Sequence, residues 1–259
     1  MPEVTLNDIT VHLRQEGSGP PLLLLHGLGS SGEDWESQIG PLSREFEVFA
    51  PDFRGHGRTS KPPGPYSVAQ FAADTTALVE TLSIAPVTII GISLGGMVAF
   101  QIAADRPDLV AQLIVVNALP AFETTRVSQR IQLAIRKVIT RRLTMEKIGE
   151  VLSKRLFPDP GLEEQRANMV ERWARNDKAA YRASFQAILD WRGVAGAMAA
   201  TQIPITVISS DLDYIPVEDK QPYVDAMPTA EMVTIEDAHH GVPMERPERF
   251  NELLAEILA

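Results

Sequence analysis

The chain has 259 residues, of which 44% are hydrophobic and 22% charged, which is typical of a single folded α/β domain. It contains no cysteine, and this excludes a thiol nucleophile, a disulfide framework and thiolate metal sites. Its formal net charge of −10 argues against nucleic acid and anionic membranes as partners, because like charges repel one another.

The first residues and the length of the apolar runs indicate in which cellular compartment the protein is expected. No run of about 18 apolar residues occurs, and the first residues lack the basic and apolar regions of a signal peptide. We therefore expect a soluble, cytoplasmic protein that does not bind membranes. The sequence does not indicate the oligomeric state.

Short apolar runs alternate with helical patterns along most of the chain. The runs are rich in leucine and β-branched residues, as strands buried on both faces are, and they cover residues 22–25, 48–50, 87–90, 113–116, 205–208 and 232–235. Helical patterns cover residues 68–82, 97–104 and 247–258. This alternation predicts an α/β fold with a mostly parallel, doubly wound sheet.

The alternation stops between residues 121 and 200, where helical periodicity continues without a convincing strand. We predict that 121–200 is a helical cap inserted into a core domain formed by 1–120 and 201–259. Two sets of apolar residues recur there at helical spacing, and we expect each to be the packed face of a helix. They are Ile131, Ile135 and Val138, and Met145, Ile148 and Leu152.

The strongest chemical signal follows the strand predicted at 87–90, where residues 91–96 read Gly-Ile-Ser-Leu-Gly-Gly and lead into a helix. In this strand–turn–helix context the G-x-S-x-G pattern marks a strained turn that exposes its serine, so we predict Ser93 as a nucleophile. The Leu94 N–H would lie at a helix N-terminus, which favours negative charge. We predict that it donates to an oxyanion together with the Leu28 N–H, which follows the strand at 22–25.

A serine hydroxyl needs a base to accept its proton. His239 and His240 follow the last predicted strand, and we expect one of them to be that base. The imidazolium in turn needs a buried carboxylate, and either Asp211 or Asp213, after the strand at 205–208, fits this role. The chain order Ser, Asp, His is the one expected for this arrangement.

A substrate pocket is expected at the same edge of the sheet. Its candidate lining residues are His26, Gly27, Trp35, Trp191 and His239. A packing role suits the tryptophans better, and the His26 ring is better suited to holding its loop by hydrogen bonds.

These motifs resemble the α/β-hydrolase superfamily, and in particular its capped serine esterases, enol-lactonases and haloperoxidase-like members. The resemblance extends over nearly the whole chain outside the cap. It rests on the serine turn, His26-Gly27, the Asp-Phe-Arg-Gly-His-Gly turn at 52–57, Arg106-Pro107, and Glu-Arg-Pro-Glu-Arg-Phe at 245–250.

The resemblance also selects between the open alternatives. In similar sequences the base lies five residues before the glutamate of the last motif, which implies His240. The acid usually lies three residues after a small residue, which implies Asp213 after Ser210. The chain departs from the pattern at Ser210, where glycine is common, and at His239, where a small residue is usual.

A serine nucleophile implies acyl transfer through an acyl-enzyme that water hydrolyses, with no metal or cofactor. We predict a carboxylesterase that cleaves carboxylic esters of small or medium size. A protein that binds small molecules without catalysis, on the same fold, is the alternative of another class.

The leading enzymatic alternative is an enol-lactone hydrolase that acts on an anionic intermediate of aromatic degradation. Residues 124–155 contain nine basic and two acidic side chains, and such a cap would attract a carboxylate. However, four of the basic residues share one helical stripe, as a solvated helix face does. They are Arg126, Arg130, Lys137 and Arg141.

Overall fold

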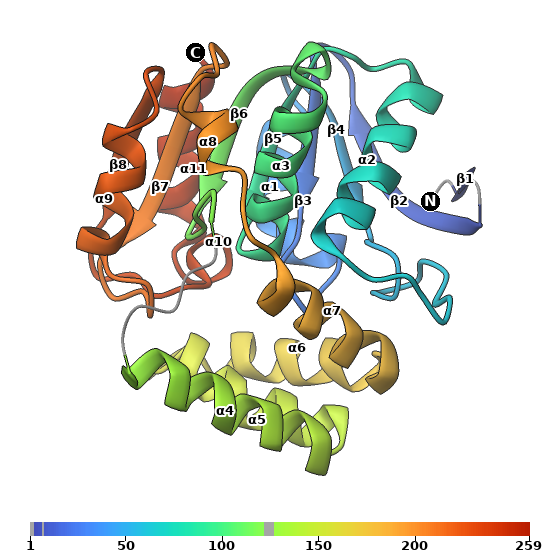
Figure 1. Cartoon of the computed structure of the whole chain (residues 1–259), viewed down its shortest axis with the longest axis vertical. Helices are drawn as coiled ribbons and strands as arrows, with labels where there is room; N and C mark the ends of the chain where they lie inside the picture. Colours follow the sequence, from blue (N-terminus) through green and yellow to red (C-terminus); the bar gives the residue numbers. More distant parts are fainter. Residues whose placement is uncertain (1–2, 7, 122–126) are drawn as a thin grey trace.

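The computed structural model describes residues 3–6, 8–121 and 127–259 (Figure 1). Its eight-stranded sheet has the order β1-β2-β4-β3-β5-β6-β7-β8. The strands are β1 Glu3–Leu6, β2 Ile9–Gly17, β3 Pro21–Leu25, β4 Glu47–Pro51, β5 Val87–Ile92, β6 Val110–Val116, β7 Ile205–Ser210 and β8 Ala230–Ile235. Strands β3 to β8 pair in parallel and β1 and β2 pair antiparallel, which confirms the predicted mostly parallel α/β fold.

Helices cover both faces of this sheet. Alternate residues of β3 point to opposite sides, so that Leu23 packs in one apolar cluster with α2 and α3, and Leu24 packs in another with α1 and α11. The helices around the sheet are α1 Glu36–Leu42, α2 Val68–Leu82, α3 Leu94–Asp105, α8 Ala195–Met198, α9 Val217–Asp225, α10 Val242–Glu245 and α11 Pro247–Leu258, with short 3₁₀ turns η1 Gly32–Trp35 and η2 Pro107–Leu109.

Four helices between β6 and β7 form a separate layer, which lies below the sheet in Figure 1. They are α4 Val127–Arg142, α5 Met145–Leu156, α6 Glu163–Ala174 and α7 Lys178–Asp190. We call these four helices the cap. They lie beyond the carboxyl ends of the parallel strands, and the insertion boundaries at 121 and 200 stay a prediction.

The two apolar rows of the cap have different surroundings. Met145, Ile148 and Leu152 are buried, which confirms the packed face predicted for α5. The prediction for α4 is wrong, because its row is more than half exposed: Ile131 is 55%, Ile135 54% and Val138 60% exposed. Helical periodicity identifies a face of a helix but not what covers it, and α4 turns a different face toward the cavity described below.

The sequence analysis missed β1 and β2. The second half of β2 exposes Gln15, Glu16 and Gly17 on an outer, antiparallel part of the sheet, so it lacks the continuous apolar character of the central strands. No helix among residues 3–6, 8–121 and 127–259 is long and apolar enough to cross a membrane.

A buried arginine fixes the turn that follows β4. The Arg54 side chain is 1% exposed, and its guanidinium donates to Asp74 on α2, with Nη2 2.8 Å from Oδ1, and to Asp8 at 3.1 Å. The preceding residue, Phe53, donates its N–H to His26 Nε2 at 3.0 Å. The ion pair therefore supports, through this turn, the loop that carries Gly27 and Leu28.

We expect Arg54→Met to lower the free energy of unfolding by about 3 kcal/mol, because it leaves the Asp74 carboxylate buried without its cation. Urea denaturation followed by circular dichroism measures this loss. Arg106→Met is the matched control, since Arg106 forms its ion pairs with Glu80 and Asp108 at the surface and its removal is expected to matter much less. Equal losses in the two variants would contradict the role given to Arg54.

Candidate active site

Ser93 occupies a strained turn between β5 and α3. Its backbone lies at φ 55° and ψ −115°, and its N–H donates to Val116 O at 3.0 Å. Glycine is required on both sides of it, because a side chain at Gly95 would overlap the carbonyl oxygen of Leu25, and one at Gly91 would overlap that of Gly95. The helix can therefore approach the strands closely enough to present Ser93 at their carboxyl edge.

His240 and Asp213 meet at the same edge. His240 Nδ1 lies 2.8 Å from Asp213 Oδ1, and both residues are buried. Asp211 is exposed, and its carboxylate accepts the Ala238 N–H at 3.2 Å instead. The loop after β7 thus turns Asp213 inward and Asp211 outward.

A buried lysine on α9 also binds this carboxylate. Lys220 is fully buried, and its Nζ lies 2.8 Å from Asp213 Oδ2, 2.8 Å from Ser209 Oγ and 3.0 Å from Asn117 Oδ1. Burial opposes the charge of Asp213, but His240 and Lys220 outweigh it and hold the pKa of Asp213 below its usual value. Burial likewise lowers the pKa of Lys220, and Asp213 partly offsets this effect.

Asn117, which follows β6, holds these groups together. Its Oδ1 accepts the Ser210 N–H at 2.9 Å as well as the Lys220 ammonium. Its Nδ2 donates to Ser210 Oγ at 2.9 Å and to His240 O at 3.1 Å. Sequence reasoning missed Asn117 and Lys220, because a polar residue after a strand and a lysine on a helix are ordinarily solvated.

Tyr214 is a third residue that the sequence analysis missed. Its hydroxyl lies 2.6 Å from His240 Nε2, and its ring stacks on the imidazole with centroids 4.1 Å apart. Burial raises the pKa of Tyr214, so the hydroxyl keeps its proton at neutral pH. In this conformation the hydroxyl occupies the hydrogen-bonding position of His240 Nε2, the atom that would accept a proton from Ser93.

The cavity above these residues has a volume of about 710 Å³ and is formed between the core and the cap. Ser93, His240 and Tyr214 line it together with Gly27 and Leu28. The predicted oxyanion donors, the N–H groups of Leu28 and Leu94, belong to the two segments that meet at Ser93. Leu94 begins α3, so its N–H has no acceptor within the helix, and its role stays a prediction, as does that of Leu28.

The structure places four of the five predicted pocket residues outside the lining of this cavity. His26 is fully buried and holds its loop through Phe53, and burial lowers its pKa to about 4, so the ring is neutral. Trp35 packs on Phe250, and Trp191 donates to Gln101 at 2.9 Å. Only Gly27 of the predicted set lines the cavity. Large aromatic side chains bury easily in any core, and so their presence in a sequence does not locate a pocket.

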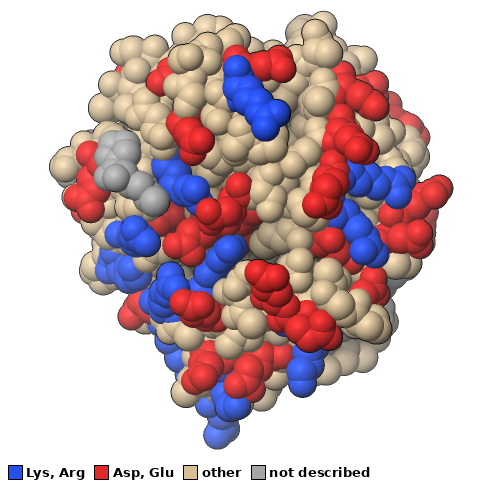
Figure 2. Space-filling view, turned by 180° about the vertical axis from the view of Figure 1, so that it is seen from behind, with Lys and Arg blue, Asp and Glu red and all other residues tan. Residues whose placement is uncertain are grey.

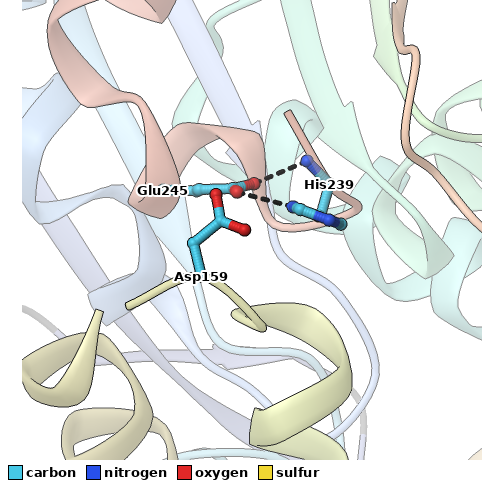
Figure 3. A group of neighbouring side chains, drawn as sticks. All are labelled: Asp159, His239 and Glu245. Carbon is cyan, nitrogen blue, oxygen red and sulfur yellow. Dashed lines mark hydrogen bonds and ion pairs between the residues drawn. The ribbon is translucent and has the colours of Figure 1, made fainter. Parts of the chain in front are cut away.

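His239, the fourth of these residues, belongs to a separate group with Glu245 and Asp159 (Figure 3). Both Glu245 oxygens accept from His239, one from the backbone N–H at 2.6 Å and the other from the ring at 2.7 Å. Asp159 pairs with Arg246 at 3.0 Å. The three candidate ligand atoms lie within 4.8 Å of one another, but these contacts already give each carboxylate a donor. The group therefore joins the α5–α6 loop to the segment after β8.

Comparison with known proteins identifies the fold. The family model described as "alpha/beta hydrolase fold" matches residues 20–135. An uncharacterised protein of Mycobacterium tuberculosis is 32% identical over 96% of this chain and 80% of its own length. This chain belongs to the α/β-hydrolase family.

Two further similarities concern hydrolases with named substrates. The (E)-2-((N-methylformamido)methylene)succinate hydrolase of Acinetobacter baylyi is 26% identical over 96% of this chain and 94% of its own. The crystal structure of the enol-lactonase from Burkholderia xenovorans has a TM-score of 0.89 and 26% identity over 99% of each chain. This chain is thus similar along its whole length to hydrolases.

Lys220 offers a test of the electrostatics around Asp213. In Lys220→Met the Asp213 carboxylate loses its buried ammonium partner, so its negative charge beside the imidazole is no longer offset. We therefore expect the acidic limb of the kcat/KM profile to move to higher pH by about one unit. Ester hydrolysis measured between pH 5 and 9 shows this shift.

Lys154→Met, which removes an exposed lysine on α5, is the control and should leave the limb in place. Circular dichroism verifies that the Lys220 variant folds. A folded Lys220 variant with an unmoved limb would show that the lysine has only a packing role.

Proposed function

We propose that the protein is a serine hydrolase that cleaves carboxylic esters of small or medium size through an acyl-enzyme intermediate. Ser93 is the nucleophile, His240 the base and Asp213 the residue that orients it. The observation that carries the proposal is the buried hydrogen bond of 2.8 Å between His240 and Asp213, at the edge where the strained turn presents Ser93.

The chemistry follows from these positions. Substrate binding displaces the Tyr214 hydroxyl, and Ser93 Oγ attacks the ester carbonyl while His240 Nε2 takes its proton. The negative charge that forms on the carbonyl oxygen is stabilised by the N–H groups of Leu28 and Leu94. The protonated His240 then donates to the leaving alcohol, and a water activated by the same histidine releases the acid. Each step uses groups of this chain and water.

Enol-lactone hydrolysis is the second candidate. A lactone is a cyclic ester, so the same residues would open it by the same steps. Two observations favour it: the similarity to the enol-lactonase of Burkholderia xenovorans, and the presence of cationic side chains in the lining of the cavity. A panel of short esters and lactones, assayed with the purified protein, separates the two candidates by their kcat/KM.

Ser93→Ala should fold normally and lose several orders of magnitude in turnover of 4-nitrophenyl butyrate, because nucleophile and base act as one unit. A serine-directed phosphonate should label Ser93 in the wild type, as mass spectrometry of the digested protein detects. Near-native turnover in the variant would exclude the mechanism. An inert wild type that still binds small esters would favour the non-catalytic binding protein.

The assignment of the acid has its own test. Asp213→Asn should cost about 10⁴ in kcat, because the amide supports the wrong imidazole tautomer. Asp211→Asn, the same change two residues away on the outward side of the loop, should retain nearly full activity. Steady-state kinetics on both variants decide the matter, and a larger loss at Asp211 would reverse the assignment.

A further inference from the structure

Two arginines of the cap line the cavity above Ser93, and no acidic residue that the structure describes pairs with either of them. Arg136 is on α4 and Arg155 on α5, and neither forms an ion pair within the described part of the chain. Arg136 Nη2 donates to the Tyr181 hydroxyl at 3.2 Å, and its guanidinium lies 4.9 Å from the centre of the Phe185 ring. Its Nε is buried and has no hydrogen-bond acceptor among the residues that the structure describes. Arg155 donates to the neutral Gln132 side chain at 2.7 Å.

Another arginine of the lining shows the contrast. Arg172 lies 3.1 Å from Asp34 and 3.4 Å from Glu33, so its charge is balanced by the protein. A guanidinium stays charged in proteins, and burying it beside tyrosine and phenylalanine is unfavourable unless an anion completes its hydrogen bonds. The Arg136 guanidinium can therefore still donate hydrogen bonds to a negatively charged group, which the described residues do not provide.

The two guanidinium groups lie close to the catalytic residues. Arg155 lies 5.2 Å from the centre of the Tyr214 ring, and the charge of Arg136 also acts on the Tyr214 hydroxyl. That hydroxyl lies 2.6 Å from His240 Nε2, and Ser93 lines the same cavity. A molecule whose anionic end binds Arg136 and that extends past Tyr214 would thus place its other end beside Ser93.

General attraction by a basic cap is a weaker explanation. Figure 2 shows acidic and basic side chains intermingled over the lower part of the molecule, on the face turned away from the viewer in Figure 1. Exposed charges of mixed sign largely cancel beyond a Debye length of about 8 Å. A contact made inside the cavity is not weakened in this way.

We infer that Arg136, assisted by Arg155, binds a carboxylate carried by the substrate, so that the preferred substrates are half-esters or lactones with a free carboxylate. The planar guanidinium matches a carboxylate with two parallel hydrogen bonds, which gives both affinity and orientation. The inference rests on the proposed acyl transfer at Ser93 for its reaction, but not for binding of the anion.

The kinetic test compares monoethyl succinate with diethyl succinate, which differ in one negative charge. Arg136→Gln should lower kcat/KM for the monoester by about 10- to 100-fold and leave that for the diester within about twofold. Arg136→Lys keeps the positive charge but loses the planar guanidinium. Its kcat/KM for the monoester should therefore lie between those of the wild type and Arg136→Gln. Equal losses on both esters would mean that Arg136 only supports Tyr181 and Phe185, and would overturn the inference.

Arg130→Gln is the matched control, because it makes the same substitution on the exposed face of the same helix. It should leave the preference for the monoester unchanged. If it lowered that preference as much as Arg136→Gln does, long-range attraction rather than contact would be responsible. Arg155→Gln gives a second, independent variant should Arg136→Gln fail to fold.

Binding of the succinate dianion, measured by calorimetry in the Ser93→Ala background, tests the site without turnover. We expect Arg136→Gln to weaken this binding by at least tenfold and Arg130→Gln to leave it unchanged. Loss of succinate binding in Arg136→Gln together with an inert wild type would refute the esterase proposal and retain the anion site. Ester hydrolysis with no preference for the monoester and no succinate binding would refute the anion site and retain the esterase proposal.

Discussion

The close contact of α3 with the strands at Gly91 and Gly95 is the constraint on which the site depends. No side chain fits at either position, and the chain must reverse between β5 and α3 with Ser93 at φ 55°. The strain of this turn is offset by the buried packing of α3. The same contact fixes the position of the loop after β3, because Gly27 adjoins Ser93. The hydrogen bond of His26 with Phe53, and the ion pair of Arg54 with Asp74, support the other side of that loop.

The second half of the site is organised around one carboxylate. Asp213 accepts from the imidazole of His240 with one oxygen and from the ammonium of Lys220 with the other. His240 and the ammonium of Lys220 hold the pKa of Asp213 below its usual value despite its burial. Asn117, directly after β6, binds Ser210 at the end of β7 and Lys220 on α9. These three elements therefore position Asp213 together.

The cap contributes charge as well as cover. Its arginines divide into those that acidic residues of the core neutralise, such as Arg172, and those that face the cavity without an acidic partner among the described residues, such as Arg136. The first kind joins the cap to the core, and the second kind brings positive charge to the lining of the cavity. In the function that we propose, the core would supply the chemistry of hydrolysis and the cap would select the substrate.

The sequence by itself determined the class of the protein. Apolar runs and helical periods gave the parallel sheet, because burial on both faces requires such runs, and the serine turn was evident because its steric demands fall on adjacent residues. The residues alone left His239 or His240 and Asp211 or Asp213 open, and the resemblance to the α/β-hydrolase superfamily implied His240 and Asp213. Only the tertiary structure decided that Lys220, Asn117 and Tyr214 contact this group, that Trp35, Trp191 and His239 lie away from the cavity, and that the apolar row of α4 is exposed. The first group of contacts joins residues far apart in the chain, and the exposure of the α4 row depends on which face of the helix is covered. Neither property produces a periodic or local pattern in the sequence.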